Sequence, residues 1–146
     1  MNIAQYTKAA SLEEAWELNQ KRSAVVLGGC CWLRLSPQRR IAQAIDLSAL
    51  GLDQIEEGED SFRLGAMVTL GQLEGHDGLA AFTQGAMKEA VRHIVGTQFR
   101  NMATVGGSIS GRFGFSDIWT LFLVLDAQVE LYKGGIVSLA DFGQTG

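Results

Sequence analysis

Two segments of the sequence join an apolar run to a pair of glycines, a pattern that can bind phosphate. Residues 25–29 read Val-Val-Leu-Gly-Gly, and residues 99–109 contain Ala-Thr-Val-Gly-Gly-Ser. Each pattern predicts a strand that runs into a glycine bend. Glycine lacks a Cβ and tolerates positive φ, so such a bend can turn sharply and bring backbone N–H groups against a phosphate. Two bends of this kind suit a pyrophosphate.

The two cysteines, Cys30 and Cys31, directly follow the first glycine pair. Two adjacent thiols are too few and too close for a tetrahedral zinc site or an iron–sulfur cluster. Adjacent cysteines also form a disulfide only with strain. We therefore interpret them as small residues of a tight turn. The two histidines, His76 and His93, lack neighbours at metal-ligand spacing and are interpreted as surface or packing residues, so no metal site is predicted.

Composition places the chain among ordinary globular proteins, because 47% of its 146 residues are hydrophobic and 19% are charged. No apolar run approaches the roughly 20 residues of a membrane span, and the N-terminus does not resemble a secretory signal, so we expect a cytoplasmic location and no membrane partner. The net charge is −4, and Lys and Arg cluster only at residues 36–40, which disfavours nucleic acid as a partner. An anionic ligand would therefore depend on local N–H groups rather than on the overall field.

The elements that must position the first glycine bend form a β-α-β pattern. Ser11 and Glu14 make a capping box that opens a helix over residues 11–20, and residues 24–27 are a β-branched run typical of a buried strand. Residues 44–47 predict another strand, and residues 3–6 an edge strand. We predict a small β-α-β lobe over residues 1–52.

The second half predicts a mixed α+β lobe over residues 53–146. A helix over residues 118–125 is apolar on nearly every face and is expected to be buried. The sequence reaches residue 146 without an evident closing element. The other expected elements are a hairpin of residues 54–56 and 62–65, a helical turn capped by Thr69, one amphipathic helix over residues 79–94, and a hairpin of residues 127–133 and 136–138.

Several of these residues also have ordinary structural interpretations. Paired glycines alone usually form turns, Asp117 can be a helix N-cap, and Thr104 and Ser108 can satisfy backbone groups in a tight bend. Large tryptophans are usually core anchors, which is the interpretation given to Trp32 and Trp119. Four arginines are expected to be solvated, and one of them, Arg100, could instead neutralise a phosphate: Arg34, Arg39, Arg40 and Arg100.

Residues 100–109, with Asp117 ten residues after Gly107, resemble the flavin-binding (medium) subunit of molybdenum hydroxylases, the xanthine dehydrogenase and carbon monoxide dehydrogenase family. Residues 27–32 stand where that family has its first phosphate loop. Residues 44–48 and 62–66 match its intervening strands, so the resemblance covers essentially the whole chain.

The resemblance implies an α+β fold, a two-lobed FAD-binding domain of the vanillyl-alcohol oxidase type, with FAD held non-covalently between the lobes. It implies an oxidoreductase subunit with no catalytic side chain of its own, since the redox chemistry belongs to the cofactor. The implied partners are a small subunit with [2Fe-2S] clusters and a large molybdopterin subunit, with electrons passing on to an acceptor such as NAD. The domain that usually follows in this family lies outside these 146 residues.

The resemblance also implies a set of cofactor-binding residues. The first loop would line the diphosphate with N–H groups, and the second would approach it from the facing side. Asp117 would accept a hydrogen bond from a ribityl or ribose hydroxyl, Gly111 stands where some relatives have a hydroxyl residue, and Ile94 would place an apolar side chain against the ring system. The full set is Leu27, Gly28, Gly29, Cys30, Cys31, Trp32, Ile94, Thr104, Gly106, Gly107, Ser108, Gly111 and Asp117.

The chain departs from this family at Cys30 and Cys31, where relatives usually have a small polar or acidic residue. Side-chain contacts at that point are therefore in doubt, whereas backbone contacts need not change. The alternative interpretation is a non-catalytic scaffold module that keeps the fold and binds FAD weakly or not at all.

Overall fold

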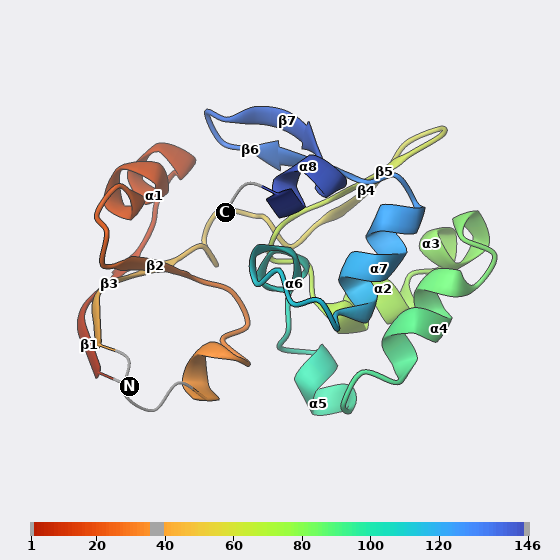
Figure 1. The fold of residues 1–146 in the computed structure, drawn as a ribbon, viewed down its shortest axis with the longest axis horizontal. Helices are drawn as coiled ribbons and strands as arrows, with labels where there is room; N and C mark the ends of the chain where they lie inside the picture. The colour runs from red at the N-terminus through yellow and green to blue at the C-terminus, as the bar shows by residue number, and fades with distance from the viewer. Residues whose placement is uncertain (1, 36–39, 145–146) are drawn as a thin grey trace.

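The computed structural model describes residues 2–35 and 40–144, which begin with a three-stranded parallel sheet (Figure 1). Its strands are β1 (Asn2–Lys8), β2 (Ala24–Leu27) and β3 (Arg40–Asp46), in the order β1-β3-β2. In the register, Tyr6 of β1 and Val25 of β2 both lie beside Ala44 of β3. The predicted edge position of the first strand is confirmed, and the third strand begins earlier than its apolar core suggests.

Helix α1 (Leu12–Asn19) packs on this sheet and confirms the helix predicted over residues 11–20. Ser11 caps it, since its hydroxyl accepts a hydrogen bond from the Glu14 amide at 3.1 Å. The Glu14 carboxylate accepts from the amide of Ala10, at 2.7 Å, rather than from that of the cap residue itself. Ala15 on the helix and Ile45 on β3 are buried together, which joins the helix to the sheet.

Two antiparallel hairpins and seven helices make up most of the remaining elements. The hairpins are β4 (Ile55–Glu57) with β5 (Phe62–Leu64) and β6 (Gln128–Leu131) with β7 (Gly135–Ser138), and both confirm predicted hairpins. A short 3-10 helix, η1 (Leu33–Leu35), follows the first glycine pair. The seven helices are α2 (Leu70–Gly75), α3 (Asp77–Phe82), α4 (Ala86–Arg92), α5 (Thr97–Arg100), α6 (Val105–Ser110), α7 (Asp117–Val124) and α8 (Leu139–Gln144).

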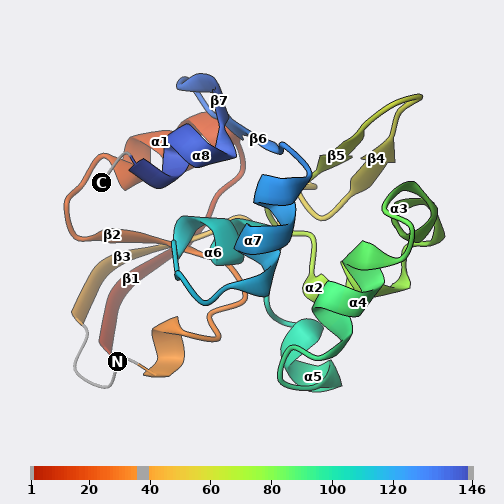
Figure 2. The ribbon, with the colours of Figure 1, turned by 45° about the vertical axis from the view of Figure 1, so that its right-hand side comes forward.

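The main core lies among these helices, away from the parallel sheet (Figures 1 and 2). Leu73 of α2, Met87 and Val91 of α4, and Ile118 and Phe122 of α7 are among its buried side chains. Thr69 caps α2 with a complete capping box, in which its hydroxyl and the Gln72 side chain each accept from the other residue's amide. The predicted helical turn is thus confirmed.

The helix predicted over residues 79–94 is wrong, because it is divided into α3 and α4. Gln84 has a φ of 51° and Gly85 a φ of 85°, values that an α-helix cannot contain. The Thr83 hydroxyl donates to the Leu79 carbonyl at 2.7 Å and accepts from the Met87 amide at 3.1 Å, so it connects the two helices across the break. The apolar spacing continued across the break because both helices face the same core.

Three further expectations are corrected. Residues 99–105 are not a strand, because α5 ends there and only an isolated bridge joins Thr104 to Thr69. Helix α7 is not buried on every face, since Val124 is 78% exposed. The chain does form a last element, α8, whose Leu139 is buried in the core.

The predicted division into lobes of residues 1–52 and 53–146 stays a prediction. Of the basic segment at residues 36–40, only Arg40 belongs to the described residues, and it is exposed as expected, whereas Arg39 lies outside them. Every helix in the ranges 2–35 and 40–144 is too short or too polar to cross a membrane.

Candidate phosphate and dinucleotide site

The two glycine segments lie against each other at the junction between β2 and α6. A Cβ built on Gly28 would stand 2.8 Å from the Thr104 hydroxyl oxygen, and one built on Gly29 only 1.8 Å from the Met102 carbonyl oxygen. A side chain at Gly29 would therefore collide with the backbone of the second segment, and one at Gly28 would require the Thr104 side chain to move. The arrangement of facing bends that the sequence predicts is therefore present.

The physical role of these glycines differs from the expected one. Neither Gly28, Gly29, Gly106 nor Gly107 is among the residues with positive φ, and the positive φ of the first bend, 57°, belongs to Cys30. The first glycine pair permits close approach of two backbones rather than an unusual dihedral angle. Gly106 has a similar role, because its Cβ would stand 2.7 Å from the Ala66 carbonyl oxygen.

The backbone amides of the two segments differ in availability. In the part of the chain that the structure describes, no amide of residues 28–32 donates a hydrogen bond to another residue. In the second segment, Gly106 donates to the Ala66 carbonyl at 2.8 Å, and Gly107 to the Thr104 hydroxyl at 3.1 Å. Ser108 donates to the Thr104 carbonyl at 2.9 Å. The unused donors therefore belong to the first bend.

Thr104 connects the two segments. It is the N-cap of α6, is 4% exposed, and holds the first turn of that helix through its hydroxyl. The same oxygen faces Gly28 across the junction. The expectation that Thr104 satisfies backbone groups is confirmed.

Cys30 and Cys31 lie in the tight turn that the sequence predicts, as two free, half-buried thiols. The Cys30 thiol donates to the Gly28 carbonyl, with 3.3 Å between Sγ and oxygen, and the Cys31 thiol to the Gly29 carbonyl at 3.6 Å. Burial raises the pKa of both thiols, and for Cys30 the neighbouring Cys31 and Asp46 raise it further. The turn therefore carries no thiolate that would repel an anion at neutral pH.

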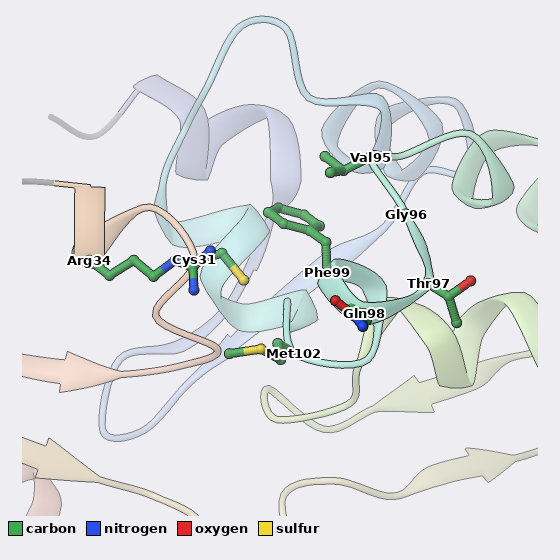
Figure 3. Close-up of a pocket in the computed structure, with 8 residues that line it drawn as sticks. All are labelled: Cys31, Arg34, Val95, Gly96, Thr97, Gln98, Phe99 and Met102. Carbon is green, nitrogen blue, oxygen red and sulfur yellow. The ribbon is translucent and has the colours of Figure 1, made fainter.

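An open cleft of about 440 Å³ lies beside the first bend (Figure 3). Cys31, Arg34, Met102 and residues 95–99 line it. Ile94 precedes this lining and is half-buried against the main core. Sequence reasoning did not select Arg34, Met102 or residues 95–99 for the site, because no periodicity or motif connects positions so far apart in the chain.

Arg100 corrects the expectation of a solvated arginine. Only 8% of it is exposed, and its Nε lies 2.8 Å from Glu74 Oε2. Its Nη1 also donates to the Ile94 carbonyl at 3.1 Å. The guanidinium connects α2 to the segment before α5, so its charge is already partnered. Arg34 is exposed as predicted.

Asp117 and Gly111 lie at opposite ends of the segment that joins α6 to α7. Asp117 is the first residue of α7 and is exposed, and the N-cap is Ser116, whose hydroxyl accepts from the Trp119 amide. The N-cap interpretation of Asp117 is therefore wrong. Gly111 ends α6, and a Cβ there would stand 2.5 Å from the Phe113 ring.

The two tryptophans of the sequence expectations differ in the structure. Trp119 packs against the main core, as predicted. Trp32 does not, because it is 50% exposed and contacts the rings of Phe113 and Phe115. Sequence reasoning missed these phenylalanines, although two aromatic residues on either side of Gly114 were a visible signal.

One histidine packs against neighbouring residues and the other is exposed. His76 caps α3 by accepting a hydrogen bond from the Leu79 amide at 3.1 Å, and its ring packs edge-on against Phe62. His93 is exposed. Among the residues that the structure places, no group of three or more His, Cys, Asp or Glu side chains could hold a metal ion.

Residues 2–144 match the family described as the FAD binding domain in molybdopterin dehydrogenase. The chain belongs to this family. This match confirms the resemblance that residues 100–109 indicate. FAD is the cofactor of that family.

This FAD-binding domain is similar to YgfM of Escherichia coli K12, an uncharacterized protein, with 32% identity over 143 residues that cover 96% of this chain and 54% of that protein. It is also similar to the nicotine 6-hydroxylase medium subunit of Paenarthrobacter nicotinovorans, with 33% identity over 132 residues, 86% of this chain and 46% of the subunit. The chain thus spans about half the length of these curated relatives.

The same domain fold occurs in the solved structure of reconstituted CO dehydrogenase from Oligotropha carboxidovorans. The TM-score is 0.82 at 26% identity, and the match covers 97% of this chain and 51% of that chain. The predicted mixed α and β fold is therefore confirmed.

The residues at the junction are compatible with FAD. Unused amides of residues 28–32 can donate to diphosphate oxygens, and the neutral thiols of Cys30 and Cys31 add no repulsion. The cleft beside them is within the usual range of small-molecule pockets, roughly 300–1,000 Å³.

Proposed function

We propose that this chain binds FAD at the junction of its two glycine segments and serves as the flavin-binding part of a molybdopterin-dependent dehydrogenase or hydroxylase. The proposal depends mainly on one observation: within residues 2–35 and 40–144, the amides of residues 28–32 donate to no other residue. Gly28 of this bend lies beside Thr104, in a member of the FAD-binding-domain family. Bound FAD would supply the redox chemistry, taking up and releasing electrons.

In this proposal the amides of residues 28–32 hold the diphosphate. Arg100, a cation near the second segment in sequence, is paired with Glu74. The diphosphate would therefore depend on the amides and not on this guanidinium. Leu27 ends β2 and positions the bend, and Thr104, Gly106, Gly107 and Ser108 form the opposing wall. Gly107 is exposed and would meet only the Thr104 hydroxyl if it carried a Cβ, which leaves its surface open to a ligand.

The remaining predicted residues extend this site in two directions. Ile94 adjoins Val95, which lines the cleft, so that the cleft would take the isoalloxazine ring. Asp117 is exposed and would accept a hydrogen bond from a ribose or ribityl hydroxyl. Gly111 lies at the end of α6, and the absence of a side chain there leaves room for the Phe113 ring.

The proposed partners are an iron–sulfur small subunit and a molybdopterin large subunit, which we place in the cytoplasm. Electrons would pass from [2Fe-2S] clusters to the flavin and on to an acceptor such as NAD. Support comes from the nicotine 6-hydroxylase medium subunit and CO dehydrogenase, to which the chain is similar over about half of their lengths.

Titration of the purified chain with FAD tests the proposal, with flavin absorption and fluorescence as readouts. The variant Gly107→Ala places a methyl group on the exposed wall. It should disturb the fold little, since only the Thr104 hydroxyl lies near the added Cβ, at 3.1 Å. The added methyl group would block the close approach of a phosphate to this wall, which should weaken FAD binding about tenfold. Gly75→Ala is the matched control, because a Cβ there meets nothing within 4 Å.

Electron relay needs a separate test. The FAD-loaded chain, reduced anaerobically by dithionite, is mixed with NAD⁺, and the appearance of NADH is followed. Rapid reoxidation of the flavin with formation of NADH would support NAD as the acceptor. A flavin that stays reduced would contradict NAD as the acceptor.

A wild-type chain that leaves micromolar FAD unchanged in absorption and fluorescence would contradict FAD binding. The scaffold interpretation would then be preferred, in which the domain keeps its fold without holding the cofactor.

A further inference from the structure

Three aromatic rings gather on the surface beside the first glycine bend, and we call them the aromatic cluster: Trp32, Phe113 and Phe115. The Trp32 ring centroid lies 5.3 Å from that of Phe113 and 5.8 Å from that of Phe115. The two phenylalanine rings are stacked at 5.4 Å with 24° between their planes. The cluster therefore joins the first bend to the segment between α6 and α7.

The aromatic cluster remains largely open to solvent. Trp32 is 50% exposed and Phe115 is 70% exposed. Neither residue belongs to the main core. Leaving two large rings in water is unfavourable, and a flat π-surface of this kind is what a planar aromatic ligand covers.

The position of the cluster connects it to the proposed diphosphate site. Trp32 is the last residue of the row of unused amides, and Phe115 lies two residues before the exposed carboxylate of Asp117. The cleft is a different region, lined by Cys31 and residues 95–99 but by none of the three rings. The bend thus has the cleft at Cys31 and the cluster at Trp32, the next residue.

FAD has one ring system on each side of its diphosphate. The tricyclic isoalloxazine is the larger and more polar of the two, and it suits the cleft, where Arg34 supplies a cation. The adenine ring is smaller and uncharged, and purines stack readily on Trp and Phe.

We propose that the aromatic cluster is the adenine subsite, in which the purine ring stacks on Trp32 and Phe115 while Asp117 faces the adjoining ribose. This inference rests on the proposed binding of FAD at residues 28–32. The ligand class is an adenine nucleotide, and the contact is made by side chains that the glycine motifs do not include.

The experiment compares FAD, ADP and FMN as ligands of the full chain and its variants. Trp32→Ala removes the ring and keeps the backbone amide, so that only stacking is lost. Trp32→Phe retains a smaller ring as a rescue variant. Phe82→Ala is the matched control, because Phe82 of α3 is 53% exposed and pairs with Phe62 of β5, outside the site.

Trp32→Ala should weaken the binding of FAD and of ADP by the same factor, about fivefold or more, and leave FMN binding unchanged. ADP should quench tryptophan fluorescence in the wild type and much less in Trp32→Phe, which should retain most of the affinity. Phe82→Ala should bind all three ligands as the wild type does.

If Trp32→Ala binds FAD as tightly as the wild type does, and likewise ADP, the adenine subsite is overturned, even though FAD binds. A loss confined to FAD and FMN would also overturn it, because the stacked ring would then be the flavin. If the wild type fails to bind FAD, the proposed function fails, and ADP binding then tests the adenine subsite separately. ADP binding that depends on Trp32 supports a purine site, whereas ADP binding that is absent or independent of Trp32 overturns the adenine subsite.

Discussion

The α-carbon of Gly29 lies against the backbone carbonyl of Met102, so that a Cβ at Gly29 would stand 1.8 Å from the Met102 oxygen. Together with the approach of Gly28 to Thr104, this contact brings the first bend against the second segment. It also explains why glycine is needed at a position whose φ is not positive. The close approach of two backbones, rather than the sharpness of the turn, is the constraint.

Gly29→Ala should therefore destabilise the fold strongly. The added methyl group must push two backbones apart, and overpacking of this kind costs about 1–3 kcal/mol or more. Urea unfolding followed by circular dichroism measures the loss. Gly75→Ala, which meets nothing within 4 Å, is the control and should unfold near the wild-type midpoint. Equal midpoints for Gly29→Ala and wild type would show that the two segments are not in contact in solution.

Arg100→Ala should lower the free energy of unfolding by about 3 kcal/mol, because it breaks a largely buried ion pair and leaves Glu74 unpaired. The side chains of Arg100 and Glu74 are only 10% and 26% exposed. Arg92→Ala removes a comparable pair with Glu89 on the surface, where the side chains are 48% and 62% exposed, and should cost less than about 1 kcal/mol. Similar losses for the two variants would contradict the buried position of Arg100.

Glu13 connects α1 to the turn between β6 and β7. Its carboxylate lies 2.5 Å from the Lys133 ammonium and accepts from the Tyr132 hydroxyl at 2.9 Å. The Lys133 ammonium also lies 4.1 Å from the centroid of the Trp16 ring. The hydrogen bond from Lys133 lowers the pKa of Glu13, and the same bond raises the pKa of Lys133.

The pH dependence of this contact follows from those directions. A carboxyl with a lowered pKa contributes stability above its ordinary pKa, and the contribution is lost as the pH falls through the lowered value. Lys133 contributes below its ordinary pKa and loses the contribution as the pH rises through its raised pKa. In a titration followed by NMR, Lys133→Met should move the Glu13 pKa toward its ordinary value. An unchanged pKa would show that the two side chains do not meet.

Cys30 and Cys31 should react slowly with iodoacetamide at neutral pH, because burial raises the pKa of both thiols and the thiolate is the reactive form. Burial dominates at Cys31, while Arg34 partly offsets it, so Arg34→Ala should slow Cys31 further. Alkylation followed by mass spectrometry gives each rate, with the urea-unfolded chain as reference. Folded thiols that react faster than unfolded ones would contradict the half-buried, neutral state.

The elements predicted well are those that a short stretch of sequence determines. The Ser11 cap opens α1, and Gly134 with Gly135 marks the last hairpin. The β-branched residues before Gly28 form β2 as predicted, although this strand lies at an edge of the sheet and is not buried as expected, since Val26 is 40% exposed. Each depends on neighbours in the chain, so periodicity and turn residues are sufficient to predict it.

The corrections concern properties set by distant contacts. Arg100 is buried because Glu74, 26 residues away, lies beside it, and the break after α3 depends on the Thr83 hydroxyl bonding in both directions. For the site, the sequence located both glycine segments. It could not reveal that the amides of Gly106 and Gly107 already have partners and that those of residues 28–32 do not.

Amide NMR of residues 28–32 with and without FAD shows whether these donors bind the diphosphate. We expect FAD to shift the amide resonances of Gly28, Gly29 and Cys30 and to slow their hydrogen exchange, because these donors acquire diphosphate acceptors. The amides of Gly106 and Gly107 should change less, since they already have protein acceptors. Bound FAD that leaves the amides of residues 28–32 unshifted and freely exchanging would contradict the account.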